Sequence, residues 1–252
     1  MPPFPPRYDV LGTAISRTTF DEVLSLLETP RDDRASVVAV CNVHSVMTAR
    51  RDPTVAAALA DADVATPDGM PLVWALNLAG HHQPERVYGP ELMRRALEER
   101  HGLRHFLYGS TAEVLARLRR RVEKNNPDVQ IVGTHSPPFG PIDQTMLDDA
   151  TDRILRSEAD VVWVGLGMPK QERWMIQMRD RLPRVTLLGV GAAFDFLAGT
   201  KPQAPRWMQQ AGLEWLFRLA TEPRRLWRRY LWNNPAFLGL LAIQVLKSRI
   251  SR

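Results

Sequence analysis

A single carboxylate, Asp68, stands between a proline and a glycine in the segment TPDGMPLVWA, directly before an apolar run. Pro67 fixes its own φ angle, and an aspartate at this point can cap the helix that the apolar run predicts. The same carboxylate could instead act as a base that takes a proton from a hydroxyl group at the mouth of a cleft. The segment alone leaves both interpretations open.

A second candidate is VGLGMPKQERW, which reads as a strand that leads through glycines into a helix. Gly165 and Gly167 would let a phosphate approach backbone N–H groups at the helix start. Gln171 and Glu172, in the first helical turn, can face a sugar or a base. Lys170 stands where a dinucleotide fingerprint has its third glycine, so NAD is not expected. A capped surface helix explains the segment about as well.

The segment LYGSTAEV predicts a similar strand-to-helix turn, in which Gly109 gives close approach and Ser110 lies at the turn. An ordinary helix cap is the favoured interpretation of this segment. Asp61 and Asp63 form a D-x-D pair that could hold a divalent ion on a pyrophosphate, although a solvated helix terminus is favoured. The six histidines lack helical i, i+4 pairing, so we expect no metal site and no cofactor.

The chain has 252 residues, a hydrophobic content of 44% and one cysteine, Cys41. That size and composition suit one large α/β domain or a domain with an appendage. The lone cysteine fits a reducing compartment, and the N-terminus lacks the pattern of a secretory signal, so a cytoplasmic protein is expected. No apolar run approaches the length of a membrane-spanning helix.

The positive charge is concentrated at the C-terminal end. Residues 201–252 hold ten Lys and Arg against two Glu, whereas residues 1–200 hold 23 Lys and Arg against 26 Asp and Glu. Aromatic residues are interleaved with the arginines, which suits an anionic membrane surface or nucleic acid. Apolar residues follow helical spacing with an expected break near Pro235, and this favours a membrane or a protein groove. A helix packed on the domain with a solvated basic face is the remaining alternative.

These residues need elements that hold them in place, and β-branched runs alternating with helical patterns predict parallel strands joined by helices. We expect strands at 36–41, 63–66, 105–109, 130–134, 161–165 and 185–188. We expect helices at 43–60 with a break near Pro53, and at 70–79, 90–101, 111–125, 143–157 and 169–181. The predicted fold is a Rossmann-like, open, mostly parallel α/β sheet with flanking helices, followed by a basic amphipathic helical appendage. Ligands of such sheets bind beyond the carboxyl ends of the strands, where the loop containing Asp68 lies.

Five segments in this order resemble the bacterial WecG/TagA/CpsF glycosyltransferase family, which includes teichoic-acid N-acetylmannosaminyltransferases, mannosaminuronic acid transferases and the xanthan glucosyltransferase GumM. They are TPDGMPLVWA, ERVYGPELM, GLGMPKQERW, GVGAAFDFLAGTKPQAP and LEWLFRLATEPRRLWRRY. The resemblance covers residues from about 36 to 230. It implies a core at 1–200 and, at 201–252, an appendage for membrane association and completion of the active site.

The resemblance also implies an activity, which is inverting transfer of a sugar from a UDP-sugar to a polyprenyl-diphosphate-linked saccharide at the inner face of the membrane. Asp68 falls on the family's proposed general base. Substrate-binding positions fall on Asn42, Arg86, Gly109, Ser110, Gly165, Gly167, Gln171, Glu172 and Asp195. Basic positions for the diphosphate and the membrane fall on Arg218, Arg224, Arg225 and Arg228. With no metal pair, arginines are expected to take the place of a metal.

Two positions depart from the family pattern, since Val40 stands where a threonine is common and Gln203 stands where an arginine is usual. Both changes could mark a different donor sugar. Nucleic acid is not an expected partner, and a homo-oligomer is left open. The alternative function is a non-catalytic protein that docks on a membrane or nucleic-acid surface through the basic tail.

Overall fold

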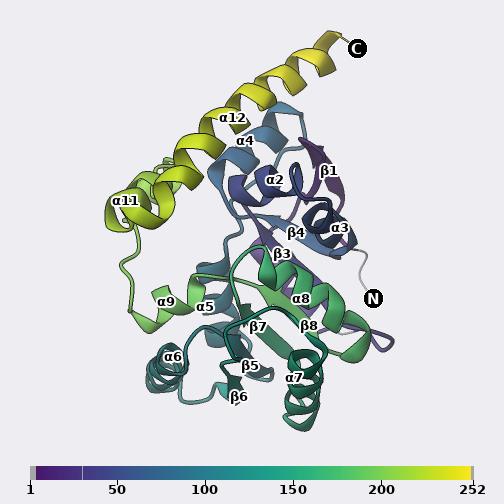
Figure 1. Ribbon diagram of the computed structural model, residues 1–252, viewed down its shortest axis with the longest axis vertical. Coiled ribbons are helices and arrows are strands. Elements are labelled where there is room, and N and C mark those ends of the chain that lie inside the picture. The colour runs from purple at the N-terminus through teal and green to yellow at the C-terminus, as the bar shows by residue number, and fades with distance from the viewer. Residues whose placement is uncertain (1–3, 30, 251–252) are drawn as a thin grey trace.

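A six-stranded, all-parallel sheet forms the centre of the computed structural model, which describes residues 4–29 and 31–250 (Figure 1). Arg252 of the basic tail lies outside this range. The strands are β3 (Ser36–Cys41), β4 (Val64–Pro67), β5 (Arg104–Gly109), β6 (Gln130–His135), β7 (Val161–Gly165) and β8 (Thr186–Gly189), in the spatial order β4-β3-β8-β7-β5-β6. The predicted Rossmann-like α/β fold and its six strands are confirmed.

Helices cover both faces of this sheet, and for that reason the inner strands read as continuous apolar runs. Every residue of β3 is buried, because no face of the strand meets water. The helices are α1 (Phe20–Leu27), α2 (Val43–Ala49), α3 (Pro53–Asp61), α4 (Met70–Leu78), α5 (Gly89–Glu99), α6 (Ala112–Asn125), α7 (Gln144–Arg156), α8 (Lys170–Met178) and α9 (Ala193–Ala198), with a short 3-10 turn, η1 (Arg179–Arg181). The expected break between α2 and α3 is confirmed, since Asp52 caps α3 and Pro53 is its first residue.

A β-hairpin that the sequence interpretation missed precedes the sheet. Strands β1 (Arg7–Val10) and β2 (Thr13–Ser16) pair in antiparallel fashion, and β2 lies beside β4. The turn between them places Leu11 and Gly12 at positive φ, which is the two-residue geometry that right-twisted hairpins prefer. Leucine at the first of these positions is not a usual turn signal, so the pattern gave no indication of the hairpin.

Three helices follow the sheet: α10 (Arg206–Gln210), α11 (Glu214–Thr221) and α12 (Pro223–Ile250). The expected break near Pro235 is wrong, because α12 continues through it and crosses one end of the molecule over α2 (Figure 1). Pro235 has no N–H to donate to the Leu231 carbonyl. Both residues are exposed, so this carbonyl is not buried without a hydrogen-bond partner. Phe237 and Leu241 are buried in the same apolar cluster as α2, and this packing holds the helix beyond the proline.

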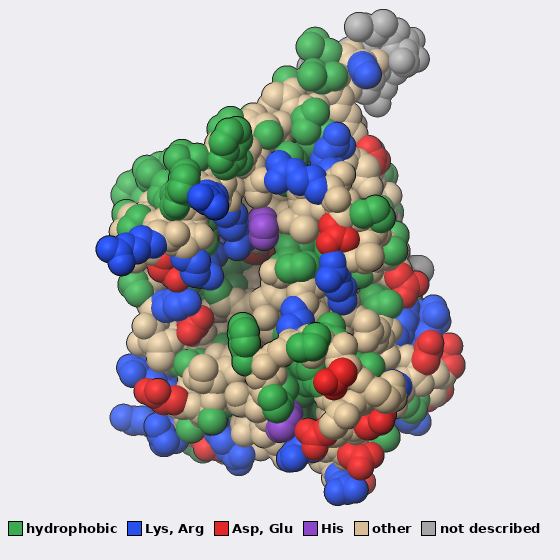
Figure 2. All heavy atoms as spheres, in the orientation of Figure 1, with side chains coloured by type: hydrophobic (Ala, Val, Ile, Leu, Met, Phe, Trp, Pro, Cys, Tyr) green, Lys and Arg blue, Asp and Glu red, His purple; other side chains and the backbone are tan. Residues whose placement is uncertain are grey.

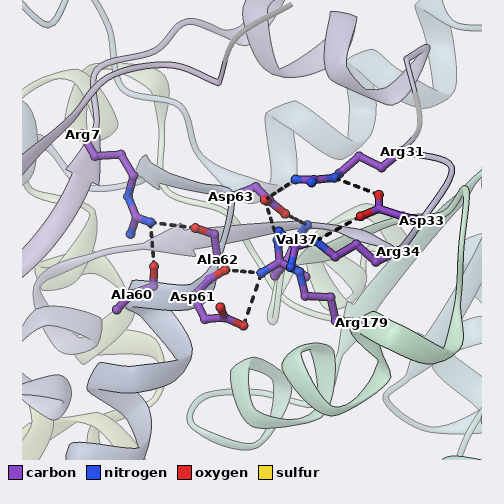
Figure 3. A network of polar contacts seen from close by, with 10 residues as sticks. All are labelled: Arg7, Arg31, Asp33, Arg34, Val37, Ala60, Asp61, Ala62, Asp63 and Arg179. Carbon is purple, nitrogen blue, oxygen red and sulfur yellow. Dashed lines mark hydrogen bonds and ion pairs between the residues drawn. The ribbon is translucent and has the colours of Figure 1, made fainter. Parts of the chain in front are cut away.

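The D-x-D pair (Figure 3) lies at the amino end of β4, whereas Asp68 follows the carboxyl end of the same strand. The carboxylate of Asp63 accepts hydrogen bonds from Arg31, Arg179 and the Val37 backbone N–H. Its side chain is 6% exposed, whereas that of Asp61 is 55% exposed. The favoured interpretation of a solvated helix terminus therefore holds for Asp61 and is wrong for Asp63, which anchors the start of β4 to its neighbours.

Candidate functional site

Asp68 lies immediately after β4 and is held there by backbone hydrogen bonds. Its N–H donates to the Cys41 carbonyl at 2.7 Å, and the next loop is tied back because the Val87 N–H donates to the Pro67 carbonyl at 3.1 Å. The residue that caps α4 is Gly69, and no side chain caps this helix. The helix-cap interpretation of Asp68 is therefore wrong, and its carboxylate is available for other contacts.

Asn42, at the end of β3, orients the carboxylate of Asp68. The Asn42 side-chain oxygen caps α2 by accepting from the His44 and Ser45 backbone N–H groups. That leaves the amide nitrogen to face Asp68, and it donates to Oδ2 at 3.4 Å. The loop after β3 therefore contributes a fixed amide donor to the Asp68 carboxylate. This is expected, because β3 and β4 are adjacent parallel strands whose carboxyl ends lie side by side.

Arg86 and Glu214 form an ion pair beside Asp68. Arg86 Nη2 donates to Glu214 Oε2 at 2.7 Å, and the guanidinium lies 4.0 Å from the centre of the Tyr88 ring. Gln203 donates a hydrogen bond to the Tyr88 hydroxyl at 2.9 Å, so it provides a neutral contact where the family usually has an arginine. These contacts connect the C-terminal helices to the α/β core at the site.

Burial raises the pKa of Asp68 to about 6. The Glu214 carboxylate contributes to this rise, whereas the Arg86 guanidinium and the Asn42 hydrogen bond act in the opposite direction. A carboxylate with a pKa near 6 is ionised at neutral pH and is a better proton acceptor than an ordinary surface aspartate. The environment of Asp68 therefore favours proton acceptance by an ionised carboxylate at neutral pH.

Two cavities meet at Asp68. The inner cavity lies at the carboxyl ends of β3, β7 and β8, and the outer cavity lies between the start of α4 and helices α11 and α12. Five residues line both of them: Asn42, Asp68, Glu214, Arg218 and Arg229. Figure 2 shows Lys and Arg side chains gathered around a hollow beneath α11 and α12. The carboxylate therefore stands at the boundary of two connected binding spaces that share two cationic side chains.

The inner cavity has a polar wall and room for backbone approach. Gln171 and Glu172 line it, and Gln171 Nε2 donates to Glu172 Oε1 at 2.8 Å. Burial raises the pKa of Glu172 to about 7. A Cβ on Gly189 would lie 3.0 Å from Gln171 Nε2, so glycine is needed there to keep the Gln171 side chain in place. Gly167 also lines this cavity.

Three of the expected glycine-loop residues lie outside both cavity linings. A Cβ on Gly109, whose φ is +112°, would lie 2.7 Å from the backbone of Gly165, and a Cβ on Gly165 would contact the Phe194 ring. The Ser110 N–H donates to the Gly165 carbonyl at 3.0 Å. These residues let β5 and β7 approach each other closely, so their structural contribution is to packing next to the site.

Of the charged residues expected at the site, some line a cavity and others do not. Arg218 lines both cavities and Arg225 lines the inner one, whereas Arg224 and Arg228 are exposed and lie outside both linings. Asp195 is also outside them, and it pairs with Lys201 at 3.1 Å.

Sequence reasoning missed Glu214 and Arg229, which line both cavities, and His44, which lines the outer one. Arg229 follows Arg225 by four residues and so lies on the same face of α12. Arg228 has the same spacing from Arg224, so the sequence alone does not separate Arg229 from its neighbour.

No group of three or more His, Cys, Asp or Glu side chains within residues 4–29 and 31–250 is arranged to hold a metal ion. Across the same described part of the chain, no helix combines the length and hydropathy needed to span a bilayer.

The sequence is similar to those of known proteins. The family model described as "Glycosyl transferase WecG/TagA/CpsF family" matches residues 8–251. A Bacillus spizizenii protein named N-acetylglucosaminyldiphosphoundecaprenol N-acetyl-beta-D-mannosaminyltransferase is 32% identical over 212 residues, which cover 82% of this chain and 80% of that protein. A Bacillus subtilis protein of the same name is 28% identical over 198 residues, covering 78% and 75% respectively.

Proposed function

The chain belongs to the WecG/TagA/CpsF family of glycosyl transferases, and from that premise we propose that it transfers a hexose from a UDP-sugar to a polyprenyl-diphosphate-linked saccharide. The donor is of the N-acetylmannosamine, mannosaminuronate or glucose type, and the transfer inverts the anomeric carbon. The observation that carries the proposal is the position of Asp68 where the two cavities meet. The two Bacillus relatives are named for an acceptor of this chemical class.

The inner cavity is the proposed donor site. It lies beyond the carboxyl ends of parallel strands, where open α/β sheets bind nucleotides. Arg218, Arg225 and Arg229 line it and would meet the diphosphate of the nucleotide. Gln171 and Glu172 line its polar wall, where the sugar would bind. In this arrangement guanidinium groups stabilise the leaving UDP, and the proposal needs no metal ion.

The outer cavity is the proposed acceptor site. Met70, Pro71, Trp215 and Tyr230 give it an apolar side, which suits the lipid-proximal part of the acceptor. Asp68 takes the proton from the acceptor hydroxyl, and that oxygen attacks the anomeric carbon from the face opposite the nucleotide. The bond from the anomeric carbon to the phosphate oxygen breaks, and UDP leaves with the electron pair.

Association with the inner face of the cytoplasmic membrane is the second part of the proposal. Exposed apolar side chains gather over the C-terminal helices (Figure 2). The exposed large apolar residues of helices α10, α11 and α12 include Trp207, Leu216, Leu231, Trp232 and Leu238. Arginines lie beside them at the start of α12. Apolar side chains next to cationic ones favour a surface with an acyl interior and anionic head groups.

The test is UDP release from a panel of UDP-sugars with a short-chain polyprenyl-diphosphate-linked N-acetylglucosamine, with magnesium and with chelator. One donor is expected to give acceptor-dependent UDP release that is unchanged by chelator, and D68N is expected to abolish it. Folded protein that releases no UDP with any donor would contradict the proposed activity, and would favour the non-catalytic surface-binding alternative.

A further inference from the structure

His44 lines the outer cavity and takes no part in the reaction described above. It lies in the first turn of α2, two residues after Asn42. Its ring contacts Asn233 of α12, and Asn233 in turn contacts Arg51, just beyond the end of α2. The chain therefore places one imidazole in the cavity that the proposed base also lines, and holds its ring through Asn233 of α12.

The hydrogen-bond partners determine which ring nitrogen carries the proton. Arg51 Nη1 lies 3.2 Å from Asn233 Oδ1, and because a guanidinium only donates, the oxygen of this amide faces Arg51. The amide nitrogen, Nδ2, then faces His44 Nδ1 at 3.2 Å. An amide NH₂ group only donates, so His44 Nδ1 is the acceptor. The proton of the neutral ring is consequently on Nε2.

The charge of the ring is fixed by its surroundings as well. The pKa of His44 is lowered to about 3, mainly by burial and in smaller part by the two cationic groups that face it, Arg229 from α12 and Arg51 from beyond α2. Asn233 is only 5% exposed, so this arrangement is shielded from solvent. His44 is therefore a neutral donor throughout the pH range in which Asp68 changes its charge.

We infer that His44 is a substrate-binding residue that donates a hydrogen bond from Nε2–H to an oxygen of the acceptor in the outer cavity. Within the described residues, Nε2 has no protein partner, although Nδ1 is hydrogen-bonded. Arg218 and Arg229 supply the positive charge of the cavity, whereas the imidazole supplies one directional, uncharged donor. Asn233 and Arg51 are positioning residues that act through the ring. The inference rests on the proposed function, because that function makes the outer cavity the acceptor site.

The placement of the proton can be tested without substrate. In protein labelled with ¹⁵N-histidine, the nitrogen shifts of His44 should show the neutral Nε2–H form from pH 5 to 8. In N233D the group that faces Nδ1 is an acceptor, so the ring should move its proton to Nδ1 or take up a second one. An Nδ1–H form in the unaltered protein, or titration near pH 6.5, would overturn the inference.

Binding is tested by two substitutions that each keep one nitrogen position of the ring. Glutamine can place an N–H near Nε2, whereas asparagine reaches only the Nδ1 position. H44N is expected to raise the KM for the acceptor about tenfold, the effect of one lost hydrogen bond, with an unchanged KM for the UDP-sugar. H44Q should restore much of the acceptor affinity. Equal acceptor KM values in all three proteins would contradict a binding role.

Two acceptors separate the atoms that could accept this hydrogen bond. If H44N raises the KM for a lipid-linked N-acetylglucosaminyl diphosphate and the KM for an alkyl N-acetylglucosaminide equally, the hydrogen-bond partner of His44 is a sugar oxygen. If only the diphosphate is affected, the partner is a phosphate oxygen. Failure of the proposed function is distinct from both results, since the unaltered protein would then transfer no sugar while the nitrogen shifts would still report the proton position.

Discussion

Arg86 and Glu214 are 128 residues apart in the sequence, yet their side chains form a 2.7 Å ion pair at the wall of the site. The side chains are 10% and 18% exposed, so the pair is largely shielded from water. Arg86 lies in the loop between α4 and α5, Glu214 begins α11, and the two side chains shift the pKa of Asp68 in opposite directions. The docking of the C-terminal helices and the protonation of the proposed base therefore depend on the same contact.

Loss of this contact should loosen the C-terminal helices. E214A leaves the Arg86 charge buried without its carboxylate, which typically costs about 3–5 kcal/mol when one partner of a buried pair is removed. We expect kcat/KM to fall at least tenfold and limited proteolysis to cut more rapidly within residues 199–222. The matched control is E98A, which removes one carboxylate from the exposed Arg94 on α5 and should change neither measurement. Equal cleavage rates in the two variants would argue against a docking role for the pair.

The activity should depend on the ionisation of Asp68. Because burial raises its pKa to about 6, the base is protonated and inactive below that pH and ionised above it. We expect kcat/KM to rise with pH to a plateau, with a midpoint near 6. In E214Q, which removes a neighbouring negative charge, the midpoint should move to lower pH. A midpoint that stays fixed in E214Q would assign the titration to another group.

The raised pKa of Asp68 also predicts that its ionised carboxylate lowers the free energy of unfolding. The pKa of Asp68 rises from its ordinary value of 3.8 to about 6, so between these values the folded chain binds more protons than the unfolded chain. The free energy of unfolding therefore falls as the pH rises through this window, and the full penalty is present above it. With allowance for the partial exposure of Asp68 to the cavities, D68N should stabilise the protein at pH 8 by about 1–2 kcal/mol. Urea unfolding at pH 8 and pH 4 measures this, and a gain that is equal at both values would point to a different cause.

The ion pairs of Asp63 should matter for stability and not for chemistry. Asp63 accepts hydrogen bonds from Arg31, Arg179 and the Val37 backbone at the amino end of β4, the end of the strand away from Asp68. D63N keeps the size of the side chain but removes its charge, and we expect it to lower the free energy of unfolding by about 3 kcal/mol. D61N, at a side chain that is 55% exposed, should change it by less than about 1 kcal/mol. Both variants should keep kcat/KM, and a large loss of activity in folded D63N would contradict a structural role.

Much of the fold follows from local patterns, because parallel strands buried on both faces must be apolar along their whole length. The segment SVVAVC of β3 is an example, and its length of six residues indicates a strand, because an apolar run of a helix is usually longer. The hairpin of β1 and β2 depends instead on Leu11 at positive φ, which the pattern does not indicate. The course of α12 through Pro235 depends on the burial of Phe237 and Leu241 against α2. Such tertiary contacts outweigh the local preference of a proline, and they cannot be read from its neighbours.

Some residues of the site could likewise be predicted from local patterns, whereas others depend on tertiary contacts. Asp68 and Asn42 follow strands directly, and Gln171 lies in the first turn of the helix after β7, so the topology of a parallel sheet is enough to bring them to one end of the sheet. Glu214 and Arg229 reach that end only because two later helices fold back onto it. Gly109 and Gly165 were expected to receive a ligand, but glycine also serves close strand packing, and a sequence pattern does not separate these two uses.

The outer side of α12 should determine membrane association. Leu231 and Leu238 are 56% and 53% exposed, whereas Phe237 and Leu241 on the other side are buried in the core. Removal of the whole tail would therefore unfold part of the core, so substitutions on the exposed side are the sharper test. L231E combined with L238E should reduce binding to vesicles of anionic phospholipid by tenfold or more, because each change places a charge where an apolar side chain would contact the acyl region of the bilayer. L155E, at a leucine of α7 that is 47% exposed, is the matched control and should bind as the unaltered protein does.

Transfer to a soluble short-chain acceptor should persist in both variants, since neither Leu231 nor Leu238 lines the inner or the outer cavity. Equal vesicle binding by the double variant and L155E would show that the apolar face of α12 does not enter the bilayer.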